Sequence, residues 1–541
     1  MSRSIWNALD RRTLLLGGAV LAATGSLLLP AFAGGGPKRG GTLTLLVNPE
    51  PSALVNIATT AGAESKISPK VTEGLLSYDF DLNPKPQLAT AWSVSEDGKH
   101  YTFSLRQGVR WHDGKDLTSK DVATSIALLK QWHARGRSTF ANVLEVRTPD
   151  PLTAVVVLSK PAPYLLYALA ASETPIVPAH IYEVGSDPAQ NPNQLAPIGT
   201  GPYRFKEWQR GSHVVYERNP DYWDQPKPYI DRLVVRFIPD PAARAAALET
   251  GELLLAGENP VPLSDIARVT ALPHLAVTTD GYGYNASQQQ LEFNLDNSYF
   301  SHADVRRAVA HAIDRQVILE RIFYGYGIVA PSPISPLVKR FYADDIKPLP
   351  FDLNKAEALL DGVGFKRDEN GTRFAVTYDY NPYYNPLMQN LGGYIRQNLQ
   401  KIGIKVTIRS QDFPAYVKRV YTDRDFDFEV NSLGNAYDPT AGVQRVYWSK
   451  NFKKGVAFSN ASHYANPEVD RLLEAAAVET DAARRVEEFK QFQHIIDREL
   501  PVINLITLKL VTIYHRKVHD HTITADGLLG NLADVYLDDT A

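Results

Sequence analysis

The sequence predicts a mixed α/β protein with more than one domain. Strand-like and helix-like segments alternate through both halves of the chain, which is the pattern of α/β architectures. At 541 residues the chain is longer than one hydrophobic core supports, so two or three domains are expected. No internal repeat or low-complexity linker separates them, which favours discontinuous domains joined by several crossing strands.

The first 33 residues have the anatomy of a bacterial export signal. Arg11 and Arg12 precede an apolar run over residues 13–29, and a small-x-small cleavage site ends at Ala33. The paired arginines favour the twin-arginine type, which carries proteins that fold before they cross the membrane. We therefore expect cleavage after Ala33 and a periplasmic mature chain. The alternative is a signal anchor that is never cleaved.

Four segments after this signal are predicted to be β-strands. They cover residues 42–47, 101–105, 233–237 and 374–378. The first is an apolar run rich in threonine, and the others alternate apolar and polar residues, as half-buried strands do.

Three further segments show helical periodicity, behind Ser119, behind Ser301 and over residues 481–500. A stripe of this kind is first of all the side of a helix that faces the core. The stripes are Val122, Ile126 and Leu129; Val305, Val309, Ala312 and Ile313; and Val486, Phe489 and Ile496.

Composition limits the possible partners and compartment. The formal net charge is -3 with no long basic run, which argues against a nucleic-acid partner. The chain has no cysteine, which excludes disulfides, thiolate metal sites and a cysteine-linked lipid anchor. No apolar stretch after Leu29 is long enough to span a bilayer. We therefore expect a soluble, monomeric periplasmic protein that is not a lipoprotein.

The chain lacks the local motifs of common hydrolases and nucleotide-binding enzymes. It has no G-x-S-x-G elbow, no G-x-x-x-x-G-K-[ST] phosphate loop and no H-E-x-x-H zinc motif. Its 13 histidines are scattered without the spacing of metal ligands. We therefore expect no enzyme activity, no cofactor and no metal site, with an exported hydrolase as a remote alternative.

Aromatic residues gather beside turn residues. Among 27 tyrosines and 7 tryptophans, the candidates for ligand contact are Tyr380, Tyr383, Tyr437 and Trp448. Tyrosine offers a flat apolar face and one hydroxyl, which suits a groove that binds varied ligands. The alternative, that these rings cap the edge of the core, is equally open.

Three longer stretches carry a family resemblance. The first includes VTEGLLSY, PQLATAW and YTFSLRQGVRWHDG between residues 71 and 114; the second includes PIGTGPY and ERNPDYW between 197 and 223; the third includes FNL, VRRA and AIDR between 293 and 315. They resemble the extracellular solute-binding proteins of family 5, which serve ABC importers of peptides, oligopeptides and nickel. The glycines of these motifs suit tight turns, so the motifs are expected to build the scaffold rather than touch ligand.

The resemblance implies the two-lobed type II periplasmic binding protein fold, in a large variant hinged by crossing strands. The large lobe would comprise residues 37–278 and 505–541, with an inserted subdomain at 76–196, and the second lobe residues 279–504. The ligand would be buried between the lobes, and the closed form would dock on the permease subunits of the inner membrane.

The resemblance also points to a ligand-contacting loop near Asn435. In peptide-binding relatives, an acid in a Trp-x-x-Asp-Tyr-x-Asp/Glu-Pro segment pairs with the peptide α-amino group. Counting back from Pro439 places Asn435 where that acid is expected, and asparagine supplies no countercharge. Asp438 takes over if the loop is shifted; otherwise it is a turn residue before proline.

The remaining candidates are charged residues near predicted strand ends or loops. Arg409 and Arg445 lie in the second lobe, where either arginine could clamp a carboxylate bidentately or form an ordinary ion pair. Glu50 follows the first strand and faces the cleft or is solvated. The leading hypothesis is a periplasmic receptor for peptides or peptide-like solutes. The missing acid at Asn435 keeps an opine, a metal chelate or an oligosaccharide open.

Overall fold

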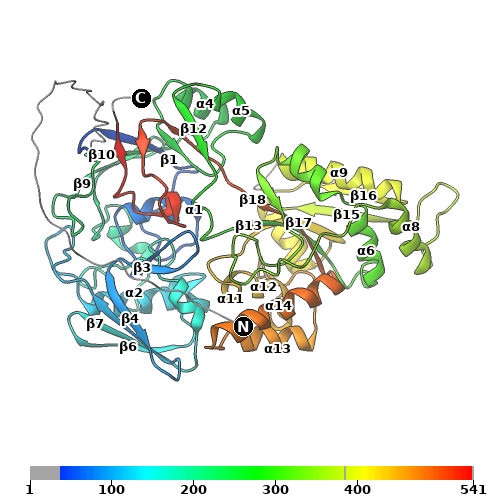
Figure 1. Cartoon of the computed structure of the whole chain (residues 1–541), viewed down its shortest axis with the longest axis horizontal. Coiled ribbons are helices and arrows are strands. Elements are labelled where there is room, and N and C mark those ends of the chain that lie inside the picture. Colours follow the sequence, from blue (N-terminus) through cyan, green and yellow to red (C-terminus); the bar gives the residue numbers. More distant parts are fainter. Residues whose placement is uncertain (1–36, 383–385, 539–541) are drawn as a thin grey trace, which may run out of the picture. The chain divides into compact units, whose positions relative to one another are not determined.

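The computed structural model describes residues 37–382 and 386–538 (Figure 1). Residues from Lys38 onward belong to one structural unit. The predicted signal residues Arg11 and Arg12, the cleavage site at Ala33, and Tyr383 lie outside the described residues. Among the residues that are described, no helix is long and apolar enough to cross a membrane.

A seven-stranded sheet forms the base of the first lobe. Its strand order is β12-β19-β11-β1-β10-β9-β8, so segments from both ends of the chain share it. β1 is parallel to β10 and β11, and the other pairs are antiparallel. The strands are β1 (Thr42–Leu46), β8 (Tyr203–Gln209), β9 (His213–Arg218), β10 (Arg232–Arg236), β11 (Leu255–Ala256), β12 (Leu275–Thr278) and β19 (Thr512–His515).

The core of this lobe follows from strand alternation. Leu43 and Leu45 of β1 lie on one face and pack with Leu233 and Val235 of β10, because every second side chain of a strand points to the same side. The helices around this sheet are α1 (Gly62–Ile67), α4 (Pro241–Glu249) and α5 (Ile266–Thr270).

A four-stranded antiparallel sheet with the order β4-β5-β7-β6 lies within the predicted inserted subdomain. Helix α2 packs on it and begins at a capping box, in which Thr118 and Asp121 satisfy each other's backbone N–H groups. The elements are β4 (Ala89–Val94), β5 (His100–Leu105), α2 (Ser119–Trp132), α3 (Gly136–Thr139), β6 (Val143–Asp150) and β7 (Thr153–Leu158), next to the hairpin of β2 (Leu76–Tyr78) and β3 (Pro84–Pro86).

The second lobe is built on a six-stranded sheet with the order β14-β18-β13-β17-β15-β16. β13 is antiparallel to β17 and β18, whereas β15 is parallel to β16 and β17. The strands are β13 (Ser287–Phe293), β14 (Gly327–Val329), β15 (Phe374–Tyr380), β16 (Ile404–Arg409), β17 (Phe428–Gly434) and β18 (Val502–Leu508).

Helices surround this sheet (Figure 1). They are α6 (Ala303–His311), α7 (Arg315–Val317), α8 (Leu353–Gly362), α9 (Leu387–Lys401), α10 (Phe413–Val417), α11 (Pro439–Gly442), α12 (Gln444–Tyr447), α13 (Pro467–Ala476) and α14 (Ala482–Glu499).

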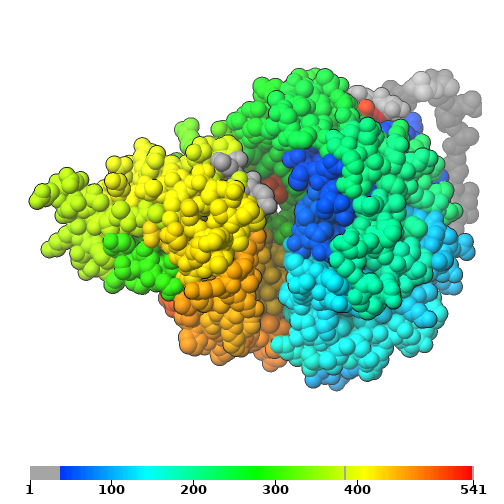
Figure 2. Space-filling model, turned by 180° about the vertical axis from the view of Figure 1, so that it is seen from behind, coloured from blue at the N-terminus to red at the C-terminus, as the bar shows by residue number. Residues whose placement is uncertain are grey.

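Two segments cross between the lobes. The chain leaves the first sheet after β12 and enters the second at β13, through residues 279–286, and it returns between β18 and β19 through residues 509–511. Residues 504 and 505, between which the lobe boundary is expected from the sequence, are both part of β18. In Figure 2 the cyan residues of the inserted subdomain and the orange residues of the second lobe face each other along a narrow line.

The four predicted strands are confirmed as β1, β5, β10 and β15, and the three predicted helices as α2, α6 and α14. Helix α6 begins at Ala303, directly after its N-cap residue His302, and it ends at His311. Ala312 and Ile313 therefore lie just beyond the helix, although both are buried in the same core.

Candidate ligand-binding site

The loop that follows β17 lies where the two lobes meet. Asn435 is buried, donates its backbone N–H to the carbonyl of Ala286 at 2.7 Å, and accepts the N–H of Ser335 on its side-chain oxygen. Gly442 closes the loop: a Cβ there would lie 1.9 Å from the Asn435 carbonyl oxygen, so only glycine fits. The loop is therefore held on the crossing segment and cannot shift freely.

Tyr437 extends from this loop to the first lobe. Its hydroxyl lies 3.0 Å from that of Thr139, and its ring centroid lies 5.5 Å from that of Tyr284 on the crossing segment. Tyr284 in turn stacks on Tyr78 at 5.1 Å. The three rings are buried and form a column of tyrosines that joins the second lobe, the crossing segment and the first lobe.

Arg445 of α12 lies beside this column. Its guanidinium donates to the carbonyls of Gly442 (3.0 Å) and Gly434 (3.3 Å), but it forms no ion pair with any residue that the structure describes. Burial and the positive charge of Arg135 lower the pKa of Arg445 to about 10. The side chain remains a cation at neutral pH and has N–H groups left for an anion.

Arg135 and Glu173 form the facing wall in the first lobe. The guanidinium of Arg135 donates to both carboxylate oxygens of Glu173, at 2.6 and 2.7 Å. Burial lowers the pKa of Arg135, but the charge and hydrogen bonds of Glu173 outweigh it, so the net shift is upward. Two arginines from different lobes thus lie near each other here, and the carboxylate of Glu173 is already paired with Arg135.

Asp438 is used inside the second lobe. It accepts the N–H of Thr440 at 2.9 Å as the N-cap of α11, and its carboxylate pairs with Arg485 at 2.7 and 2.8 Å. The carboxylate is fully buried, and the side chain of Arg485 is only 4% exposed. Its charge is therefore compensated, and Asp438 supplies no free countercharge for a ligand.

Two of the other candidates, Arg409 and Trp448, are engaged in polar contacts away from this loop. Arg409 donates to Asp379 at 2.6 Å and also contacts Asp425. The indole N–H of Trp448 donates to Glu474 at 2.9 Å. These contacts belong to the second lobe alone.

Glu50 and Tyr380 also lie apart from the Asn435 loop. Glu50 accepts the indole N–H of Trp208 and the backbone N–H of Gly211, both at 2.9 Å. Tyr380 is 1% exposed within the apolar core of the second lobe. The structure thus brings together Asn435, Tyr437 and Arg445, with Asp438 behind them.

Sequence reasoning missed the partners in the first lobe and in the crossing segment. Arg135, Thr139, Glu173 and Tyr284 come from three separate segments, and none lies in a recognisable motif. Within the described residues no cluster of three or more His, Asp or Glu side chains could hold a metal ion. The side chains gathered here offer hydrogen bonds, charge and aromatic surface.

Comparison with known proteins agrees with this architecture. The family model for bacterial extracellular solute-binding proteins, family 5 Middle, matches residues 83–455. The oligopeptide-binding protein AppA of Bacillus subtilis is 28% identical over 86% of this chain and 86% of its own length. The glutathione-binding protein GsiB of Salmonella typhi is 27% identical over 84% of this chain and 86% of its own.

Solved structures share the fold. AppA from Bacillus subtilis in complex with a nonapeptide superposes with a TM-score of 0.75 at 27% identity, covering 93% of this chain and 100% of AppA. AgaA from A. tumefaciens R10 in complex with agropinic acid gives 0.73 at 27% identity, covering 93% and 99%. These relatives are binding proteins with two lobes of the type II periplasmic class. The chain belongs to the family of bacterial extracellular solute-binding proteins, family 5.

Proposed function

We propose that this protein is the periplasmic receptor of an ABC importer and captures peptides or peptide-like solutes that carry a free carboxylate. The resemblance to AppA and GsiB supports a peptide-type ligand. The ligand binds between the lobes, stabilises the closed arrangement, and is delivered to permease subunits in the inner membrane.

The observation that carries this proposal is the unpaired state of Arg445. A half-buried guanidinium without an acid has lost part of its hydration, and a carboxylate that accepts two parallel N–H bonds offsets that cost. Arg445 retains free N–H groups beside the tyrosine column, and Arg135 adds positive charge from the other lobe. Arg445 and Arg135 together therefore favour an anionic group on the ligand.

The side chains near Arg445 and Arg135 offer little to the α-amino group of a peptide. Asn435 has no charge, Asp438 is paired with Arg485, and Glu173 is paired with Arg135. The ligand is therefore held mainly by its carboxylate end, and its ammonium end receives hydrogen bonds without a dedicated acid.

A second candidate is an acidic opine. The missing acid at Asn435 favours a ligand without a free α-amino group, and AgaA, a relative of similar identity, was solved with agropinic acid. Metal chelates and oligosaccharides complete the ligand classes to be compared. No turnover of any ligand is expected.

A thermal-shift screen of residues 34–541 separates these classes. At a ligand concentration of about 100 times Kd, binding stabilises the protein by roughly 2.7 kcal/mol. Peptides of two to five residues with a free carboxylate should raise Tm. A clear shift from opines, chelates or glycans, with none from any peptide, would replace the peptide assignment.

We also propose that the protein reaches the periplasm as a folded, soluble monomer without a lipid anchor, after cleavage behind Ala33. The paired Arg11 and Arg12 support twin-arginine export. N-terminal sequencing of the exported protein should begin at Gly34, and an intact Met1 would contradict cleavage.

A further inference from the structure

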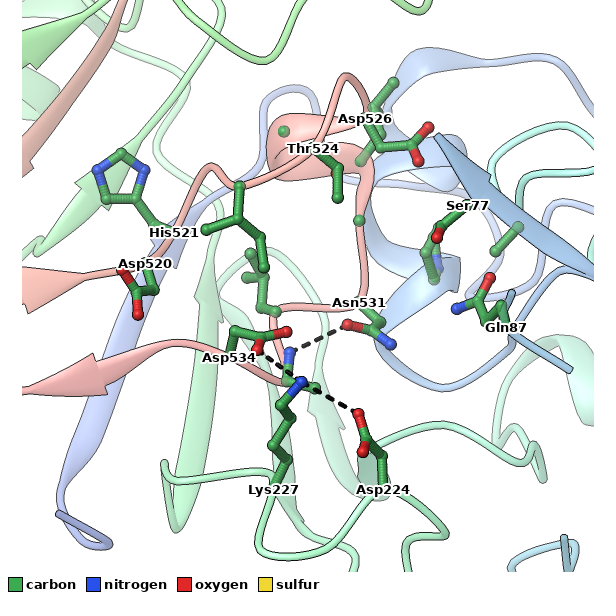
Figure 3. Close-up of a pocket in the computed structure, with 18 of the residues that line it drawn as sticks. Ser77, Gln87, Asp224, Lys227, Asp520, His521, Thr524, Asp526, Asn531 and Asp534 are labelled. Carbon is green, nitrogen blue, oxygen red and sulfur yellow. Dashed lines mark hydrogen bonds and ion pairs between the residues drawn. The ribbon is translucent and has the colours of Figure 1, made fainter. Parts of the chain in front are cut away.

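The first lobe contains a cavity that lies apart from the Asn435 loop (Figure 3). Its volume is about 240 Å³, and its walls come from residues 171–172, 222–227 and 520–534, completed by side chains between residues 69 and 87. All of these segments belong to the first lobe and its C-terminal extension. Its lining includes none of Asn435, Tyr437 and Arg445.

The lining of this cavity is acidic. Four carboxylates, those of Asp224, Asp520, Asp526 and Asp534, stand against the single ammonium of Lys227. Lys227 is shared between Asp534 at 2.6 Å and Asp224 at 3.0 Å, as the dashed lines of Figure 3 show. Lys227 forms its ion pairs with these two acids and not with Asp520 or Asp526. Four carboxylates and one ammonium leave the cavity with an excess of negative charge.

Two buried polar side chains at the cavity wall have unused hydrogen-bonding capacity. Asp526 is 6% exposed and Ser172 is 2% exposed, and neither the Oδ1 of Asp526 nor the Oγ of Ser172 has a hydrogen-bond partner among the described residues. Buried acceptors of this kind are normally satisfied, so each calls for a donor.

The nearest cation of the protein does not fill this role. Lys70 lies behind Asp526, but its ammonium donates to the carbonyl of Leu528 at 2.7 Å and to that of Gly530. Burial raises the pKa of Asp526 to about 7; the charge of Lys70 opposes this shift and that of Glu173 adds to it. The carboxylate is therefore mostly ionised above neutral pH and lacks a donor.

The rest of the wall suits a short aliphatic chain. Trp223, Ile523, Leu529 and Leu532 contribute apolar surface beside the acids. His521 adds no positive charge, because burial lowers its pKa to about 4. The combination of apolar wall, excess negative charge and donor-seeking oxygens is complementary to an alkylammonium ion.

We propose that this cavity is a second binding site, which takes a small aliphatic ammonium compound with its N–H groups directed at the carboxylate of Asp526. The site does not depend on the proposed solute site at Arg445. It would let the receptor bind an organic cation in the first lobe while the interface between the lobes binds an anionic solute.

Isothermal titration near pH 8 with n-butylamine, 1,4-diaminobutane, n-butanol and tetramethylammonium tests this proposal. The two amines should bind at least about tenfold more tightly than butanol, which lacks the charge, and than tetramethylammonium, which lacks N–H donors. Asp526→Asn should weaken amine binding at least about tenfold, because it removes the charge that pairs with the ammonium.

Two control variants show whether a loss of amine binding is specific to this cavity. Asp344→Asn removes an exposed carboxylate of the second lobe and should leave amine binding unchanged. Arg445→Gln should also leave amine binding unchanged. Loss of the amine site and loss of the proposed solute site are therefore separate outcomes. Equal binding of butylamine and butanol, absence of amine binding in the millimolar range, or unchanged binding in folded Asp526→Asn would overturn the proposal.

Discussion

At the residue scale, Asn435 and Asp438 show how neighbouring polar residues differ in role. Asn435 holds the loop to Ser335 and to the crossing segment, whereas Asp438 neutralises Arg485 in a fully buried pair. Removing one partner of such a pair leaves the other charge unpaired in the interior, which is more costly than losing one neutral hydrogen bond.

Asp438→Asn should therefore destabilise the protein more than Asn435→Ala. The expected loss is about 3–5 kcal/mol for Asp438→Asn and about 1–3 kcal/mol for Asn435→Ala. Chemical denaturation of both variants measures the difference. A loss below about 1 kcal/mol for Asp438→Asn would show that Arg485 is solvated or finds another partner.

Sequence reasoning placed some of these residues and not others for a physical reason. Arg445 was considered because arginine binds carboxylates, but only the structure shows that it lacks an acid while Arg409 has two. Arg135 and Glu173 carry no local pattern, since their pairing depends on how distant segments meet. Burial and partner, which decide the role of a charged residue, are not visible in sequence.

At the element scale, the strands and helices could be predicted because their hydrophobic periodicity is local. The alternation in β5 and the stripe of α2 each correspond to one buried face in the structure. A lobe boundary near residue 504 has no such local signal, because β18 is buried along its whole length.

Adjacent strands also pair two buried acids. Glu292 of β13 and Glu429 of β17 are directly opposite in register, and both are fully buried. Burial raises the pKa of Glu292 to about 8, and burial together with the charge of Glu292 raises the pKa of Glu429. The folded state therefore holds a proton that the unfolded chain releases above its ordinary pKa of about 4.5.

Because the folded state binds more protons, this pair contributes stability that is present below about pH 4.5 and is lost as the pH rises towards about 8. Glu292→Gln carries no titrating proton and should reduce the fall in unfolding free energy between these limits. Denaturation at several pH values, compared with the exposed variant Glu468→Gln, measures this slope. An identical slope in wild type and Glu292→Gln would contradict the assignment.

The close approach at Gly442 gives a test of the loop itself. Gly442→Ala places a methyl group against the Asn435 carbonyl and should displace α12, so that solute affinity falls at least about tenfold. Gly393→Ala in α9 meets no neighbouring atom and should stabilise the helix by about 0.5–1 kcal/mol without changing affinity. Equal affinity of the two variants would remove the loop from the site.

At the scale of the whole molecule, the lobes are joined by crossing segments and by contacts between side chains. Lys339 of the second lobe pairs with Asp81 of the first at 2.8 Å, but both side chains are exposed. Exposed pairs of this kind contribute little stability. The tyrosine column is buried and therefore contributes more to holding the lobes together than this exposed pair.

Protein labelled with one dye on each lobe should report directly whether solute closes the two lobes. The chain has no cysteine, so single cysteines at Leu144 and Phe351, which are 67% and 43% exposed, accept two dyes. Saturating solute should shift the population of transfer efficiencies in single-molecule measurements, and Arg445→Gln should respond only at a concentration raised at least about tenfold. A distribution that solute leaves unchanged would argue against ligand-dependent closure.

Isothermal titration of one peptide as free acid and as C-terminal amide tests whether Arg445 binds the carboxylate of the captured solute. Wild type should prefer the acid by at least about tenfold, and Arg445→Gln should lose that preference, because bidentate charge-assisted bonds disappear. The exposed variant Arg471→Gln should behave like wild type. Equal affinity of wild type for acid and amide, or a preference that persists in Arg445→Gln, would contradict the claim.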